Sequence, residues 1–142
     1  LYCGITNAGL KLVGSYIYAN GSTVATTSDQ RKKQDITPLA DNYLQLIKAV
    51  EPVSFKYTSD IALSGRTHTG FIAQQVLEAM NTSGINAEDF AAFVDLNKDG
   101  KEYALRYEEF IPLLLLYIQT IDNELQTLKE KKGDLNGDTE NQ

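Results

Sequence analysis

Residues 110–129, FIPLLLLYIQTIDNELQTLK, contain the most regular pattern in this 142-residue chain. Their apolar side chains recur at alternating spacings of three and four residues over nearly three heptads. This spacing is typical of a coiled-coil seam, in which a and d positions face partner helices. The seam positions are Ile111, Leu114, Ile118, Ile121, Leu125 and Leu128.

Isoleucine occupies both kinds of core position in this seam, with Ile118 at a and Ile121 at d. That choice shifts the preference from dimers towards trimers or tetramers. An amphipathic helix packed on its own domain is the alternative, but the chain offers no second long helix to cover the seam. We therefore expect a helix over about residues 107–132 in a parallel trimeric coiled coil, and a polar tail over residues 133–142.

The segments before this helix predict a small mixed domain. Residues 38–51 have a helical apolar stripe that is closed by Pro52. Residues 53–57 alternate between apolar and polar side chains and predict a strand. A second strand at 69–72 is expected to lead into a short helix over 73–80. The predicted fold class is therefore α+β.

A hairpin is expected where residues 91–94 and 101–105 flank Asp99-Gly100, because Asp-Gly supplies the positive φ values of a tight turn. The stretch from Asp95 also matches the first six positions of a calcium-binding EF-hand loop. The twelfth position should supply a bidentate carboxylate, and here it is Arg106. A cation removes the main ligand, so we expect a plain turn and no metal site.

Composition excludes several classes of function. The net charge is −6 and no Lys/Arg stripe is interleaved with aromatics, which disfavours nucleic-acid binding. The longest strongly apolar run, residues 110–118, has about half the length that a membrane span needs. One cysteine, Cys3, and one histidine, His68, exclude most metal-ligand clusters. We expect no cofactor, no nucleic-acid partner and no membrane partner.

Residues 1–27 are rich in Gly, Ser, Thr and Tyr and contain short alternating pieces. This pattern predicts short strands and turns with an apolar face too thin to fold alone. We expect this segment to pair with other chains or with upstream sequence. Its first residues have the character of an internal segment, so we expect the chain to be a fragment of a longer protein.

Residues 26–36, TTSDQRKKQDI, combine hydroxyl side chains with two acids and three cations. Ser28 becomes a nucleophile only if a base takes its proton, and Lys33 can act as that base if its protonated form is disfavoured. Neighbouring cations at Arg31 and Lys32 act in that direction. A separation of five residues does not align two side chains on a helix face, so a turn must bring them together. On spacing alone, a solvated basic loop is the stronger interpretation.

Four blocks of sequence extend this interpretation. In order from residue 28 to about residue 129, they are SDQRKKQDI, EPVSFKY, HTGFIAQQV and YALRYEEFIPLLLLYIQTIDNELQTLK. Together they resemble the C-terminal intramolecular chaperone auto-processing domain of phage tail spikes, tail fibres and endosialidases. Two departures are small: Glu51 stands where an Arg often precedes the Pro, and Gln75 replaces the usual Glu.

The resemblance implies a homotrimer that helps an upstream β-structure to fold in register and then cuts itself off. It assigns Ser28 as the nucleophile and Lys33 as the general base of a single-turnover serine endopeptidase. His68 lies in a block that borders the cleavage segment in the family, where it could orient the dyad, donate to the leaving amine or be structural. Gln74 is expected to hydrogen-bond backbone near the site. Asp29 either positions the segment or caps a turn.

The resemblance also divides the chain into the end of a fibrous β-stalk, residues 1–27, and a chaperone and auto-processing domain, residues 28–132. Ser28 can attack the carbonyl of Thr27 through a five-membered ring, whereas a cut between Ser28 and Asp29 needs either a hydroxyl from another subunit or a different role for Ser28. The sequence leaves both sides open.

The family implies assembly in the host cytoplasm, with the cleaved domain released and absent from the mature virion. A trimeric attachment module that never cleaves remains the alternative function, because the seam and the β-rich start suit both.

Overall fold

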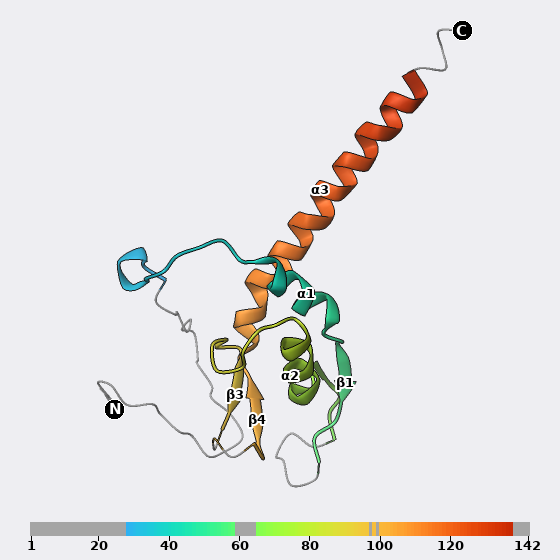
Figure 1. Cartoon of the computed structure of the whole chain (residues 1–142). Helices are drawn as coiled ribbons and strands as arrows, with labels where there is room; N and C mark the ends of the chain where they lie inside the picture. Colours follow the sequence, from blue (N-terminus) through green and yellow to red (C-terminus); the bar gives the residue numbers. More distant parts are fainter. Residues whose placement is uncertain (1–27, 59–64, 97, 99, 138–142) are drawn as a thin grey trace, which may run out of the picture. The chain divides into compact units, whose positions relative to one another are not determined.

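The computed structural model describes residues 28–58, 65–96, 98 and 100–137 (Figure 1). The described chain is α+β, with two small two-stranded sheets and a long C-terminal helix, as the sequence predicted. It divides into two compact units by its contacts. Among the described residues, the first contains 28–36, 54–58 and 65–68, and the second contains 37–53, 69–96, 98 and 100–137. The β-stalk predicted for residues 1–27 lies outside the described residues.

The first unit contains a short 3-10 turn, η1 (Gln30–Lys32), and half of a small sheet. In that sheet β1 (Val53–Phe55) pairs with β2 (His68–Gly70). Both strands were predicted close to these positions, and both are shorter or shifted by a residue or two. Such shifts are expected, since strand ends are set by hydrogen-bond partners that a single sequence does not reveal.

The second unit contains helix α1 (Asp41–Ala49), which begins three residues after the predicted residue 38 and ends before Pro52. The residue before a proline is disfavoured in helical conformation, so the helix stops short of the predicted residue 51. No side chain caps its first turn, because the N-cap position is Ala40. Its stability therefore depends on burying Leu46 and Ile47 rather than on local signals.

Helix α2 (Ala73–Thr82) ends in a Schellman motif. The Ile85 N–H donates to the Met80 carbonyl at 2.9 Å, and the Gly84 N–H donates to the Asn81 carbonyl at 3.2 Å. Gly84 has a φ of 70°, the left-handed conformation that this motif requires and that glycine adopts at little cost. Ile85 is buried, so the turn that ends the helix also contributes to the core.

The predicted hairpin is present, but its connection is longer than a two-residue turn. Strands β3 (Phe93–Asp95) and β4 (Tyr103–Leu105) pair antiparallel, with Asp95 opposite Tyr103. The Leu96 N–H donates to the Glu102 carbonyl at 2.9 Å, which leaves residues 97–101 as the loop. Gly100 supplies a positive φ of 71°, and its N–H donates to the Asp95 carboxylate at 2.9 Å. The carboxylate thus closes a wider loop than Asp-Gly alone predicted.

The core of the second unit lies where three helices meet. Its largest fully buried side chains come from α1, α2 and the first turn of α3 (Phe110–Gly137), which follows the 3-10 turn η2 (Tyr107–Glu109). The largest of them are Phe110, Leu46, Met80, Leu113 and Val76. Phe110 lies at the centre of this core, because its ring contacts the rings of both Phe71 and Phe90, with centroids 5.2 and 6.3 Å apart.

Helix α3 has two apolar faces, one buried against the core and one exposed. Phe110 and Leu113 are buried against the core, and Tyr117 packs at its edge. The helix then runs on away from α1 and the hairpin (Figure 1), and every described side chain from residue 121 to 133 is exposed. It begins three residues later than predicted, because residues 107–109 form η2, and it continues to Gly137 rather than ending at 132. The predicted tail therefore starts as helix.

The position of the core predicts a contrast between two leucines. Leu46→Ala should lower the free energy of unfolding by about 2–5 kcal/mol, because it leaves a cavity in a fully buried site. Leu96→Ala removes the same atoms from a side chain that is 51% exposed in the hairpin loop, and it should cost less than about 1 kcal/mol. Urea denaturation followed by circular dichroism measures both, and equal losses would contradict this description of the core.

Candidate functional site

The candidate site is a tight turn in the first unit. Within η1, the Lys32 N–H donates to the Asp29 carbonyl at 2.9 Å and the Lys33 N–H donates to the Gln30 carbonyl at 3.0 Å. Asp29 before the turn and Lys33 after it both have extended backbone conformations. The turn therefore joins two extended segments and brings its flanks together. The side chains of Ser28, just before Asp29, and of Lys33 can then meet.

Ser28 and Lys33 are in contact across this turn. The Lys33 Nζ lies 2.9 Å from the Ser28 Oγ, within hydrogen-bond distance. This is the separation required of a base that takes the hydroxyl proton of a serine. Five residues of sequence separation are compatible with the contact because the segment is a 3-10 turn with extended flanks, and not an α-helix. Both side chains are exposed in the single chain.

Asp29 caps the turn and pairs with Arg31. Its Oδ1 accepts the backbone N–H of Arg31 at 2.9 Å, and the Arg31 guanidinium donates to the same carboxylate, with the shortest contact 2.6 Å from Nη2 to Oδ2. The Arg31 guanidinium, and after it the backbone N–H of Arg31, hold the pKa of the Asp29 carboxyl below its usual range. The same pairing raises the pKa of Arg31. Of the two roles considered for Asp29, capping is therefore present in the geometry.

His68 has aromatic neighbours in the same unit. It lies on β2, where its ring stacks on Phe55 with centroids 5.8 Å apart and meets the edge of Tyr57 at 5.0 Å. Phe55 and Tyr57 also contact one another at 5.3 Å. These ring contacts join β2 to the end of β1 and the residues after it. The roles considered for His68 stay predictions.

Gln74 lies exposed in the first turn of α2, in the second unit. Its predicted contact with backbone near the cleavage site stays a prediction. Thr27, on the other side of the expected scissile bond, lies outside the described residues.

The predicted seam of α3 is exposed along its length. Its members are Ile111, Leu114, Ile118, Ile121, Leu125 and Leu128, each between 45% and 65% exposed. Leu115, which follows a seam position, is also exposed, at 54%. The residue that does pack against the core is Leu113, which lies one turn after Phe110 on the same face of the helix.

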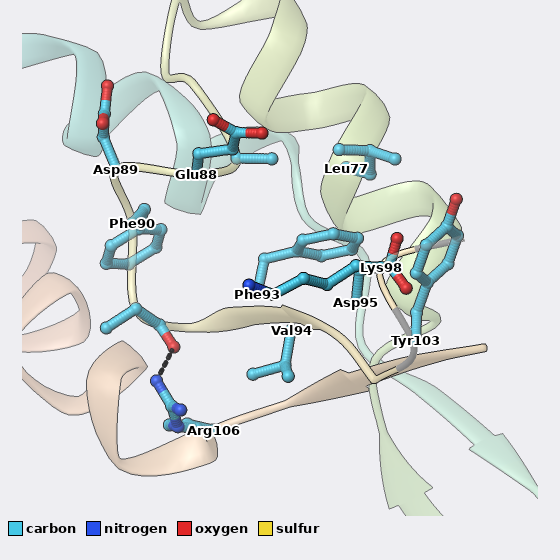
Figure 2. Close-up of a pocket in the computed structure, with 12 residues that line it drawn as sticks. Leu77, Glu88, Asp89, Phe90, Phe93, Val94, Asp95, Lys98, Tyr103 and Arg106 are labelled. Carbon is cyan, nitrogen blue, oxygen red and sulfur yellow. Dashed lines mark hydrogen bonds between the residues drawn. The ribbon is translucent and has the colours of Figure 1, made fainter. Parts of the chain in front are cut away.

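An open hollow of about 850 Å³ lies between α2 and the β3–β4 hairpin in the second unit (Figure 2). Leu77, Phe93 and Tyr103 line it together with charged side chains, and none of the residues predicted for the cleavage site does so. At one end the Arg106 Nη1 donates to the Ala91 carbonyl at 2.8 Å. The cation at the twelfth position of the calcium-like loop therefore fastens the base of the hairpin.

In the described part of the chain, no three His, Cys, Asp or Glu side chains are grouped so that they could hold a metal ion. None of the described helices combines the length and the apolar character that a membrane span requires.

Sequence reasoning missed the role of Arg31, which was considered only as a neighbouring cation. The available signal was the spacing: an aspartate at an N-cap can accept from the backbone N–H two residues later, and an arginine there can fold back on the same carboxylate. Its guanidinium, with donors in a fixed fork, suits a carboxylate at this short range.

Comparisons with known proteins agree with the sequence motifs. Residues 28–85 match the family described as chaperone of endosialidase, and the match begins at Ser28 itself. Depolymerase 1, capsule K3-specific, of Klebsiella phage KP32 is 35% identical over 86 residues, which are 58% of this chain and 10% of that protein. The predicted resemblance to the intramolecular chaperone family is therefore confirmed.

The fold is also similar to solved structures. A novel intramolecular chaperone aligns with a TM-score of 0.56 and 23% identity, over 68% of this chain and 99% of that chain. The carboxy-terminal domain of the bacteriophage T5 L-shaped tail fibre, with its intramolecular chaperone domain, aligns with a TM-score of 0.49 and 21% identity. The alignment covers 84% of this chain and 34% of that chain. The first of these likenesses establishes the fold of most of the chain.

The Asp29–Arg31 pair predicts a measurable pKa and pH dependence. Carboxyl NMR should give Asp29 a pKa below the ordinary value of about 3.9, and Arg31→Ala should return it towards that value. Because the pKa is lowered in the folded turn, the pair contributes above the ordinary pKa and is lost as the pH falls through the lowered one. An Asp29 pKa that is unchanged by Arg31→Ala would show that the pair does not persist in solution.

Proposed function

Since residues 28–85 carry the sequence of the chaperone of endosialidase family, we propose that this chain trimerises, directs the folding of an upstream phage fibre or spike segment, and releases itself by autoproteolysis at Ser28. The observation that carries the proposal is the 2.9 Å contact between Lys33 Nζ and Ser28 Oγ. It supplies a nucleophile and a base at hydrogen-bond distance within one short turn. The family match beginning at Ser28 supports a domain boundary at the same residue, with residues 28–132 downstream.

The proposed reaction is an attack of the Ser28 Oγ on the carbonyl carbon of Thr27. Lys33 takes the hydroxyl proton, a five-membered ring forms, and the bond from the Thr27 carbonyl to the Ser28 nitrogen breaks as that nitrogen gains a proton. The product is an ester between Thr27 and the Ser28 oxygen. Water then hydrolyses the ester to a carboxylate on Thr27 and a free hydroxyl on Ser28. Each chain reacts once, and no cofactor enters the balance.

The pair lacks cover in the single chain. A lysine is a base only when its protonated form is disfavoured, and removal from water is the strongest way to achieve this. Ser28 and Lys33 are both exposed here, as are all residues from 28 to 41. We propose that neighbouring chains provide the missing cover, so that the reaction waits for assembly.

The exposed seam of α3 supports a parallel homotrimer. Six large apolar side chains at a and d positions face away from their own core, and isoleucine at both positions favours more than two strands. Joining three chains at one end turns the alignment of their upstream segments into an intramolecular process with a high effective concentration. This is the physical basis for setting the register of a three-chain β-structure during virion assembly in the host cytoplasm.

A trimeric attachment module that never cleaves is the second candidate. The exposed seam favours it equally, because a permanent trimeric coiled coil needs the same helix. The Ser28–Lys33 contact distinguishes the two, since a module that never cleaves does not need it. A denaturing gel of the freshly expressed longer protein separates them, because self-cleavage gives two bands and the module that never cleaves gives one.

Loss of either member of the pair should block the cut. Ser28→Ala and Lys33→Ala should each slow cleavage by about a thousandfold or more, since such groups act as a unit. Lys33→Arg should fail as well, because arginine stays protonated at any usable pH. The matched control is Lys32→Ala, which removes the adjacent exposed cation and should still cleave. Normal processing by Lys33→Ala, followed on denaturing gels, would overturn the assignment.

Assembly and cleavage should fall together. Ile118→Asp places a charge in the seam and should reduce both the trimer, measured by sedimentation equilibrium, and the amount of cut product. Gln119→Asp introduces the same side chain one position away, at an exposed site outside the seam, and should change neither. A wild-type chain that stays monomeric at micromolar concentration would contradict the proposed trimer. A monomeric Ile118→Asp chain that cleaves normally would show that the whole site lies within one chain.

A further inference from the structure

We propose that Asp29 and Arg31 are positioning residues for the Ser28–Lys33 pair, an inference that rests on the proposed self-cleavage. Neither side chain contacts the serine hydroxyl. Both lie between the two reacting groups in sequence, and they are joined to each other by four hydrogen bonds. We refer to this Asp29–Arg31 interaction as the clamp.

The clamp closes the turn that sets the distance between Ser28 and Lys33. The Asp29 Oδ1 accepts the Arg31 N–H at 2.9 Å, while the Arg31 Nε lies 3.1 and 3.2 Å from the two carboxylate oxygens. The guanidinium is thereby folded back over the same turn whose backbone bonds end at Lys33. Residue 29 follows Ser28 and residue 31 precedes Lys33 by two, so the clamp fixes both flanks.

Apart from the Ser28–Lys33 contact, few other interactions order this turn in the described residues. A 3-10 turn of three residues has only two backbone hydrogen bonds, which rarely suffice in water. The turn contains no buried residue, so no apolar packing contributes. An N-cap hydrogen bond and a charge-assisted bidentate pair are therefore the main local sources of order. The clamp is also exposed, with Arg31 87% and Asp29 40% accessible, so its effect is modest.

The clamp has a second consequence for the base. Asp29 is adjacent to the nucleophile, and a free carboxylate there would favour the protonated form of a nearby lysine. The Arg31 guanidinium donates to that carboxylate, and the Lys33 amino group contacts the Ser28 hydroxyl instead. The same residue therefore shapes the turn and removes a competing partner for Lys33.

A set of variants of the 142-residue chain tests the proposal, with cleavage followed on denaturing gels and assembly followed by sedimentation. Asp29→Ala should slow cleavage about tenfold, equivalent to 1.4 kcal/mol in the barrier. Asp29→Asn keeps an acceptor for the Arg31 N–H and should recover part of that loss. Gln30→Ala is the control, since it alters an exposed neutral side chain within the same turn and should cleave at the wild-type rate.

A double-mutant cycle distinguishes a clamp from two independent residues. Arg31→Ala should also slow cleavage about tenfold, and Asp29→Ala with Arg31→Ala should be slowed about as much as either single variant. A combined loss near a hundredfold would mean that the residues act separately, and it would overturn the proposal. So would wild-type cleavage by Asp29→Ala.

The pH profile of cleavage supplies a readout that a purely structural role would not move. Arg31→Ala should shift the midpoint of the profile to higher pH, because the freed Asp29 carboxylate then favours protonated Lys33. The double variant lacks that carboxylate and should not show the shift. If neither variant moves the midpoint, the second consequence is wrong. Ser28→Ala distinguishes failure of the proposed function from failure of this inference. If Ser28→Ala still cleaves, the proposed function is refuted. If Ser28→Ala is blocked but the clamp variants cleave at the wild-type rate, only this inference is refuted.

Discussion

An apolar seam that its own chain does not cover is the constraint on which the rest of this structure depends. Helix α3 inserts Phe110 and Leu113 into the core of the second unit and then presents six large apolar side chains to solvent. Full burial of one such side chain stabilises by about 1.5–3 kcal/mol relative to exposure. Covering only the exposed part of six of them in each chain represents several kcal/mol, which is of the same order as the free-energy cost of association.

The same constraint gives meaning to the exposed site in the first unit. Ser28 and Lys33 are in contact, but water surrounds them in the single chain. A catalytic pair assembled in water is weak, because hydration stabilises the protonated lysine. In the proposed mechanism, association through α3 changes the surroundings of the pair while its internal geometry is already present. Cleavage is then controlled by desolvation, and the chain remains whole until its partners have arrived.

The sequence predicted those features that repeat or that close an element. The 3-4 spacing identified α3 and its exposed face, and Pro52 identified the end of α1, because both signals are local and leave few alternatives. It did not distinguish Leu113 from Leu115, because four consecutive leucines fit either face and only the position of the core decides. The hairpin loop was likewise misjudged, since the Asp95 carboxylate closes it from outside the Asp-Gly pair. For the candidate site, the sequence identified the pair and the need for a turn, but the role of Arg31 depends on a side chain folding back, which spacing alone does not specify.

The site differs from the fold in the range of its interactions. The core joins residues as distant as Leu46 and Phe110, so it forms only when the second unit folds. The turn from Ser28 to Lys33 involves six consecutive residues, and local turns form in microseconds or less. Its geometry is thus available before the fold is complete and cannot by itself delay the reaction. If premature cleavage is to be avoided, the delay must come from a requirement that one chain does not satisfy, and the uncovered α3 seam supplies such a requirement. In the proposed mechanism, a short-range site combined with a requirement for assembly would allow the cut to follow assembly without any movement of the reacting residues.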